Sequence, residues 1–390
     1  MRKPYSLIPM ALGALLLATG CEETAASIDA SIIEKDQAIE SSGGNSSDQM
    51  TSGKNEKTKN EKVNTGEEEN KKEKKTKPKK PFSPIPPPED AKPLKTKYPA
   101  KVKKKMPSEE AHGGDPKRTV PFGQTLLKGK KDLTNGPLQH YRLVTYYGNP
   151  LSDDMGILGE LPPKEMMKRL KEQASAYSKL DPAHPAVPTI ELIATVAQRN
   201  AGPDGNYVMK TPDDEIQPYV KLAKKNDALL LLDVQLGRAS VMHGVKAVKE
   251  YLKLPFVHLA IDTEYSVGKG EVPGVDLGHV DGAEIQEAID YVSRLVEKYE
   301  LPDKVVVVHQ FGNGIIKHKS KIHPTKNVEV VLNYDGFGIA AVKMAAYGKL
   351  VRKQAIQYGG FKLFYDEDEP LLTPKQVLKL DPAPAVVNYQ

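Results

Sequence analysis

The chain has 390 residues, a single cysteine, no tryptophan, 39% hydrophobic residues and 27% charged residues. The hydrophobic share lies below the roughly 45–50% usual for a purely globular chain, which indicates a folded domain joined to a long unfolded segment. One cysteine excludes an internal disulfide framework and any metal site built from cysteines alone.

Charge is distributed unevenly along the chain. Residues 1–50 hold 3 basic and 7 acidic side chains, residues 51–118 hold 20 and 11, and residues 119–390 hold 33 of each. Because the last part carries no net charge, its electrostatics predict no nucleic-acid partner. The basic stretch either lies near an anionic membrane surface or only keeps a linker solvated and extended.

The N-terminus has the pattern of a secretion signal. Met1–Lys3 is basic, an apolar run extends from Leu7 to Ala18, and a Leu-Ala-Thr-Gly-Cys sequence ends at Cys21. The run is short of the about 20 residues that a membrane span needs, and small residues follow it, so residues 1–20 are predicted to be a signal peptide. The cut site resembles the lipobox of bacterial lipoproteins. That resemblance implies acylation of Cys21 and a lipid anchor on the extracytoplasmic face of the bacterial cell membrane, with an ordinary signal peptide as the alternative.

Residues 21–118 are predicted to be a disordered tether. They are rich in Lys, Glu, Ser and Pro and poor in aromatic residues, so they offer too little apolar surface to offset the entropy of an ordered chain. The proline-rich stretch at 84–88 is expected to form a stiff polyproline spacer. A tether of this length lifts a domain away from a membrane and into a cell wall.

From about Val120 short apolar runs alternate with longer segments of helical periodicity. Near-continuous apolar runs are typical of parallel strands buried on both faces. The expected strands are Arg142–Tyr147, Thr189–Val196, Ala228–Val234, Val257–Ile261, Lys304–His309, Val328–Tyr334, Phe361–Tyr365 and Ala385–Tyr389. The expected helices are Pro163–Tyr177, Asp213–Lys225, His243–Leu252, Asp281–Tyr299, Gly338–Tyr358 and Pro374–Leu378.

Eight strands alternating with helices over residues 119–390 predict an α/β fold of the (β/α)8 TIM-barrel class, which typically needs roughly 250 residues. The fifth crossover, Gly312–Lys321, is expected to be a loop. No helix follows the last strand, and residues 121–138 are expected to cover the open side instead. The alternative is an open doubly wound sheet, which lacks the glycine-rich G-x-G-x-x-G turn that would favour it.

Polar and aromatic side chains follow nearly every predicted strand, at the end where barrel enzymes carry their chemistry. A strand must end in something polar, but the density of acids, amides, tyrosines and histidine is greater than that requirement explains. We therefore expect a binding cleft there. Its predicted substrate-binding residues are Tyr146, Tyr147, Asp233, Gln235, His309, Gln310, Tyr334, Asp335, Asp366 and Asn388.

The sharpest catalytic hypothesis concerns Asp262 and Glu264 after the fourth strand. Residues two apart on a strand face the same way, so both carboxyls are expected to point into one hollow. Two acids held close cannot both ionise cheaply, and one pKa rises. A carboxyl with a raised pKa protonates a glycosidic oxygen at neutral pH. The simpler interpretation is that one acid caps a helix or forms an ion pair.

The Asp262-x-Glu264 sequence resembles the end of the family 18 chitinase motif and the acidic pair of family 25 lysozymes. Leu-Asn-Tyr-Asp, ending at Asp335, is similar to the first family's Met-x-Tyr-Asp. The resemblance implies that Glu264 is the proton donor, that Asp262 orients an acetamido group acting as nucleophile, and that Tyr334 contacts that group. The family's earlier aspartates fall on Val257 and Ala260, and its eighth-strand tryptophan is replaced by Asn-Tyr.

The sequence thus predicts a membrane-anchored hydrolase that acts on cell-wall or other N-acetylated glycan by general-acid catalysis, with no cofactor and no resident metal. The first alternative is a surface glycan binder without catalysis, in which tyrosines supply the stacking faces. The second is a metal-dependent hydrolase, although no familiar ligand spacing supports it. Its candidate ligands are Asp233, Asp262, Glu264, His309 and Asp335.

Overall fold

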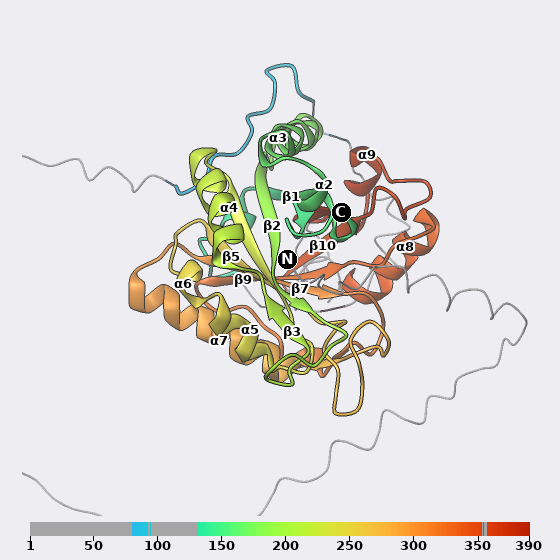
Figure 1. Cartoon of the computed structure of the whole chain (residues 1–390). Coiled ribbons are helices and arrows are strands. Elements are labelled where there is room, and N and C mark those ends of the chain that lie inside the picture. Colours follow the sequence, from blue (N-terminus) through green and yellow to red (C-terminus); the bar gives the residue numbers. More distant parts are fainter. Residues whose placement is uncertain (1–79, 93, 95–131, 353, 355–356) are drawn as a thin grey trace, which may run out of the picture. The chain divides into compact units, whose positions relative to one another are not determined.

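The computed structural model describes residues 80–92, 94, 132–352, 354 and 357–390 (Figure 1). The expected signal peptide, the lipidation site Cys21 and most of the expected tether lie outside the described residues. Among the described helices, none combines the length and the apolar character needed to cross a membrane.

Eight parallel strands form a closed barrel, which confirms the predicted (β/α)8 fold. Around the barrel their order is β1, β2, β4, β5, β7, β9, β10 and β11, and β11 returns to β1. The closing pair β1–β2 runs in register from Arg142 opposite Ala186 to Gly148 opposite Leu192. The strands are β1 (Arg142–Gly148), β2 (Ala186–Ala197), β4 (Leu229–Gln235), β5 (Val257–Asp262), β7 (Lys304–Gln310), β9 (Val328–Tyr334), β10 (Tyr358–Leu363) and β11 (Val386–Tyr389).

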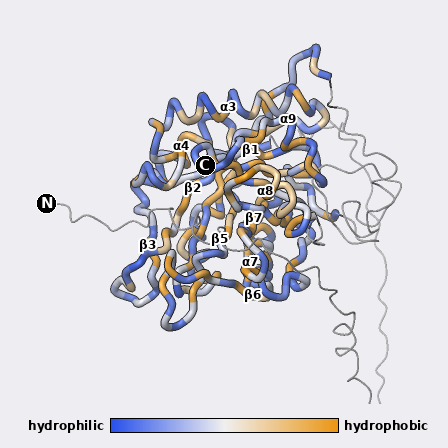
Figure 2. Tube along the Cα trace, turned by 90° about the vertical axis from the view of Figure 1, so that its right-hand side faces the viewer, coloured by the Kyte–Doolittle hydropathy of each residue, from blue (hydrophilic) through white to orange (hydrophobic). Residues whose placement is uncertain are grey.

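Most of the strands form here because they are runs of β-branched and other apolar residues that are buried on both faces. Every residue of the eight strands is buried. The helices pack their apolar residues against the barrel. Hydrophobic residues concentrate along the strands, as Figure 2 shows. The polar residues within the strands therefore stand out as exceptions.

Helices occupy most of the crossovers. Local signals set their ends: α3 begins with a proline in its first turn, and the Asp281 side chain caps α7 by accepting from Ala283 N at 2.8 Å. The helices are α2 (Ile157–Glu160), α3 (Pro163–Leu180), α4 (Asp213–Lys225), α5 (Val241–Ala247), α6 (Lys249–Leu252), α7 (Gly282–Tyr299), α8 (Ala340–Tyr347) and α9 (Pro374–Val377). Single 3-10 turns are η2 (Pro137–Gln139), η3 (Asp153–Met155) and η4 (Lys319–Lys321).

The sixth crossover differs from expectation. A continuous helix to Tyr358 is wrong, because α8 ends at Tyr347, a π-helical turn η5 (Gly348–Arg352) follows, and Tyr358 already begins β10. Tyr358, at the end of the predicted helix, belongs to strand β10 instead. Between β7 and β9, where a loop was expected, the chain forms only β8 (Ile316–Lys317) and η4; β8 pairs with β6 (Val280–Asp281). The remaining strand, β3 (Val208–Lys210), runs antiparallel to the end of β2.

Two segments pack at the N-terminal ends of the strands. Of residues 121–138, those from 132 onward are described, and Leu138 N donates to the buried Glu329 Oε2 at 3.0 Å near the start of β9. Residues 80–92 and 94, which fall within the expected tether, also contact the barrel: Ser83 N donates to Asp227 O at 2.7 Å and Ile85 N to Ala186 O at 2.8 Å. The packed part of the chain therefore begins no later than Lys80.

Candidate functional site

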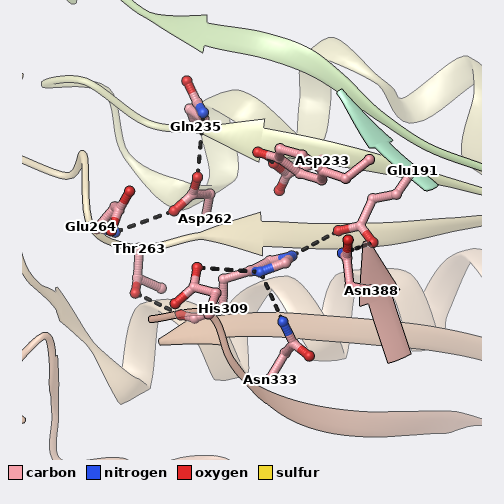
Figure 3. Close-up of polar contacts among 11 residues, drawn as sticks. Glu191, Asp233, Gln235, Asp262, Thr263, Glu264, His309, Asn333 and Asn388 are labelled. Atoms are coloured by element: carbon pink, nitrogen blue, oxygen red, sulfur yellow. Dashed lines mark hydrogen bonds and ion pairs between the residues drawn. The ribbon is translucent and has the colours of Figure 1, made fainter. Parts of the chain in front are cut away.

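The predicted acid pair lies at the mouth of the barrel, by which we mean the C-terminal ends of its strands. Asp262 is the last residue of β5, and Thr263 Oγ1 donates to His309 O at 2.8 Å on the neighbouring strand β7. Glu264 lies in the turn that follows, and the charge of Asp262 acts on its carboxyl, so the two acids lie close together. Glu264 N donates to Asp262 Oδ1 at 3.4 Å, and Gln235 Nε2 donates to Asp262 Oδ2 at 3.3 Å (Figure 3).

The loop after β5 fixes the backbone of Glu264. Its carbonyl accepts from Gly278 N at 2.9 Å. Only glycine fits at 278, because a Cβ there would lie 2.1 Å from the Ser266 carbonyl oxygen. The Tyr265 side chain interacts with the Glu264 carboxyl and slightly opposes the rise of its pKa. Glu264 and Tyr265 are both half-buried residues.

Burial and mutual repulsion raise the pKa values of both acids. Burial, followed by the nearby Asp335 carboxylate, raises the pKa of Asp262 to about 6. Burial, followed by the charges of Asp262 and Asp335, raises the pKa of Glu264 well above its usual range. Both carboxyls therefore hold their protons more strongly than isolated carboxyls do.

Below the mouth, the barrel encloses a polar chamber, which we define by Glu191, Asp233, His309, Asn333, Lys362 and Asn388. Glu191 lies at its centre: its Oε1 is 2.7 Å from His309 Nε2, and its Oε2 accepts from Asn388 Nδ2 at 2.6 Å (Figure 3). Both Glu191 and Asn388 are wholly buried. A carboxyl group this deep needs such hydrogen-bond partners around it.

His309 connects the chamber to the mouth. Its Nδ1 lies 3.2 Å from Asn333 Nδ2 and 3.4 Å from Asp335 Oδ2. Burial opposes protonation of the imidazole, but the carboxylates of Glu191 and Asp335 outweigh it and raise the pKa of His309 well above its usual range. An imidazole that contacts an acid on each side links the deep layer electrostatically to the mouth.

Asp233 occupies the other side of the chamber. Its Oδ2 accepts from the Tyr147 hydroxyl at 3.0 Å, and the Lys362 ammonium lies 3.6 Å from the centre of the Tyr147 ring. Burial, followed by the Asp262 charge, raises the pKa of Asp233 to about 8. Met155, Ile193 and Val196 pack with Tyr147 as a small apolar cluster that closes this side.

Most of the predicted residues come together, and alternation along the strands explains those that do not. Tyr146 was predicted to bind substrate, but its ring contacts Tyr389, whose hydroxyl is 2.7 Å from that of Tyr177 on α3. It therefore lies on the outer face of β1, opposite to Tyr147. Adjacent strand residues point to opposite faces, so only one of the two tyrosines faces the interior.

Tyr334 and Gln310 are corrected for the same reason. The Tyr334 ring packs 6.0 Å from Phe361, which in turn contacts Tyr347 of α8, so it faces the helices and does not contact an acetamido group inside the barrel. Gln310 Nε2 donates to Leu350 O in η5 at 3.0 Å, again on the outer face. Asp366 is exposed beyond β10, where its charge acts on Glu160 rather than on the acid pair.

Three residues of the chamber were not predicted: Glu191, Asn333 and Lys362. Glu191 and Lys362 do carry a signal in the sequence, because a charged residue in the middle of an apolar strand must have a partner when the strand is buried on both faces. Asn333 lies two residues before Asp335 and so shares its face of the chain.

The chamber also contains a group of potential metal ligands. One ligand atom each from Glu191, Asp233 and His309 lies within 4.8 Å of the others, and all three residues are buried. The predicted ligand set included two of these, Asp233 and His309. Asp335, which also belonged to the predicted set, lies beside Nδ1 of His309, whereas Glu191 lies beside Nε2. Glu191 was not in the predicted set.

A groove of about 600 Å³ lies elsewhere, on the outside of the barrel along α4 and α6. Lysines and apolar side chains form much of its lining, including Lys221, Lys224, Leu254 and Phe256. It contains none of the predicted site residues, so it does not correspond to the cleft expected at the strand ends.

Comparisons with known proteins add little to this geometry. No family model matches the chain, and no curated protein matches its sequence. Among solved structures, it is similar to a GH18 chitinase from Pseudoalteromonas aurantia, with 10% identity, a TM-score of 0.30, and coverage of 64% of this chain and 93% of that one. A likeness this low carries no argument about function.

Proposed function

We propose that the mouth of the barrel is the active site of a glycan-directed hydrolase in which Glu264 is the general acid. The observation that carries the proposal is the position of Glu264 at the strand ends beside Asp262 and Asp335, where the residue is half-buried and the pKa of its carboxyl is raised. A proton donor for a glycosidic oxygen must keep its proton near neutral pH and still be reachable by substrate.

Asp262 is proposed to position the reacting groups. Both of its oxygens accept a hydrogen bond, from Gln235 and from the Glu264 backbone, and these bonds fix its orientation. The parallel register places Asp233 opposite Ala260, one of the positions where family 18 chitinases carry an aspartate. A neighbouring strand therefore supplies a carboxyl close to where that family has one. N-acetylated polysaccharide is the substrate class that this resemblance favours.

The proposed location is the extracytoplasmic face of a bacterial membrane, with the chain anchored through acylated Cys21. The lipobox-like sequence supports this proposal. Cys21→Ser is expected to move the full-length protein from the membrane fraction to the soluble fraction, because two acyl chains hold a protein stably on a bilayer. A variant that stays with the membrane after a salt wash would contradict the anchor.

The test of the activity is a Glu264→Gln variant of the full-length protein. The wild type is expected to release new reducing ends from fragmented cell wall. Loss of general-acid catalysis should lower that rate by about 100-fold or more, because such groups typically contribute 10²–10⁴-fold. Glutamine keeps the shape of the side chain, so binding to insoluble wall should remain.

Asp366→Asn is the matched control, since it also removes one carboxylate near the mouth but from an exposed position away from the acid pair. Its rate should equal that of the wild type. Equal rates for wild type and Glu264→Gln would refute the proposed role. Retention on wall without any new reducing ends in the wild type would instead favour a non-catalytic binder.

A further inference from the structure

We propose that the polar chamber inside the barrel binds one divalent first-row transition-metal ion, of which Zn²⁺ is representative, between Glu191, Asp233 and His309. The ion would lie below the acid pair and would be held by three different strands, β2, β4 and β7. The site does not rest on the proposed hydrolase activity, because Glu264 is not among its ligands.

The geometry of the three side chains suits such an ion. Their candidate ligand atoms lie within 4.8 Å of one another. Ligand atoms about 2.0–2.2 Å from a metal are about 3.3 Å apart in a tetrahedral site, so small side-chain rotations bring all three onto one ion. Glu191, Asp233 and His309 are 0%, 0% and 1% exposed, so the metal would be shielded from competing solvent.

Unpaired oxygens provide an independent observation. Asp233 Oδ1 and Asn388 Oδ1 are both buried, and neither has a hydrogen-bond partner among the described residues. Asn388 already donates to Glu191, so its free oxygen lies beside the proposed ligands. Buried polar atoms are normally paired. The Asn388 oxygen is an acceptor, and so is Asp233 Oδ1 once that carboxyl has lost its proton, so what they require is a donor or a cation.

Charge in this region favours the cation. The described chamber and mouth bring together five carboxyls, those of Glu191, Asp233, Asp262, Glu264 and Asp335. The Lys362 ammonium and the His309 imidazole, whose pKa is raised, face the same space and offset only part of the charge that five ionised carboxyls would carry. Repulsion among close carboxylates would be relieved by a bound divalent ion.

The donor set indicates the class of metal. One imidazole with two carboxylates suits zinc and its first-row neighbours, whereas Mg²⁺ and Ca²⁺ prefer oxygen ligands alone. Binding would replace the hydrogen bond between His309 Nε2 and Glu191 Oε1. The imidazole must then be unprotonated at Nε2 to bind the ion.

The test is retention of Zn²⁺ by the full-length protein after chelator treatment, reloading with zinc chloride and dialysis. One zinc per chain is expected, with Mg²⁺ and Ca²⁺ failing to displace it. Glu191→Gln and Asp233→Asn should each weaken zinc binding by more than about 100-fold, since even residues outside the ligand shell change metal affinity 10–100-fold.

Glu264→Gln separates the two proposals, because it should lose hydrolysis and keep its zinc. A wild type that retains no stoichiometric zinc would overturn the site, as would zinc binding that is unchanged in both ligand variants. If those variants fail to fold, Co²⁺ added to the wild type must still give the visible absorption of a nitrogen- and oxygen-ligated ion. A spectrum identical to that of cobalt in buffer would overturn the site.

Discussion

At the scale of single residues, the chemistry of the mouth comes from the neighbours that each acid has. The pKa of Glu264 is raised because burial and two nearby carboxylates disfavour its ionised form, and each unit of pKa shift corresponds to about 1.4 kcal/mol. Asp262 accepts two hydrogen bonds, and its pKa is raised to about 6. A raised pKa is what permits a carboxyl to donate a proton near neutral pH.

At the scale of elements, α8 depends on an unusual inward-facing lysine. Lys343 is buried and donates to Lys362 O at 3.0 Å, and it forms an ion pair with the buried Asp368. Asp368 in turn accepts from Phe364 N and Gly338 N, both at 3.0 Å. The pair therefore joins the start of α8 to the end of β10, next to the mouth.

Lys343→Met is expected to destabilise the protein by about 3–5 kcal/mol, because it leaves Asp368 buried and without its cation. The measurement is the urea midpoint of unfolding. Lys349→Met, an exposed lysine just after the same helix, should change stability by no more than about 0.5 kcal/mol. The double variant Lys343→Met/Asp368→Asn should regain part of the loss, and a double variant as unstable as the single one would contradict this explanation.

At the scale of the whole molecule, the barrel was predictable from sequence because its strands are buried on both faces. That burial leaves eight apolar runs in order, and parallel strands need a crossover between each pair. The boundary between α8 and β10 was not predictable, because apolar residues before Tyr358 suit a helix and a strand equally well.

Part of the candidate site was predictable from the sequence. The errors arose because side chains alternate between the two faces of a strand. The pattern at the strand ends predicted Tyr147, Asp233 and His309, which do face the interior. It also included their neighbours Tyr146 and Gln310, which face outward. Alternation shows which residues of a strand share a face. Which of the two faces points into the barrel is known only once the orientation of one residue is known. The same rule, applied to charged residues within the strands, would have found Glu191 and Lys362.

At the barrel mouth, burial and the nearby Asp262 and Asp335 carboxylates hold the pKa of Glu264 well above its usual range. Carboxyl ¹³C NMR titration of Glu264 in the wild-type protein measures this pKa directly. Glu264 is expected to ionise well above the ordinary value of about 4.3. Asp335→Asn is expected to lower that pKa by removing a neighbouring negative charge. Ionisation of Glu264 at its ordinary value, unaffected by Asp335→Asn, would overturn the proposed role of Glu264 as the acid.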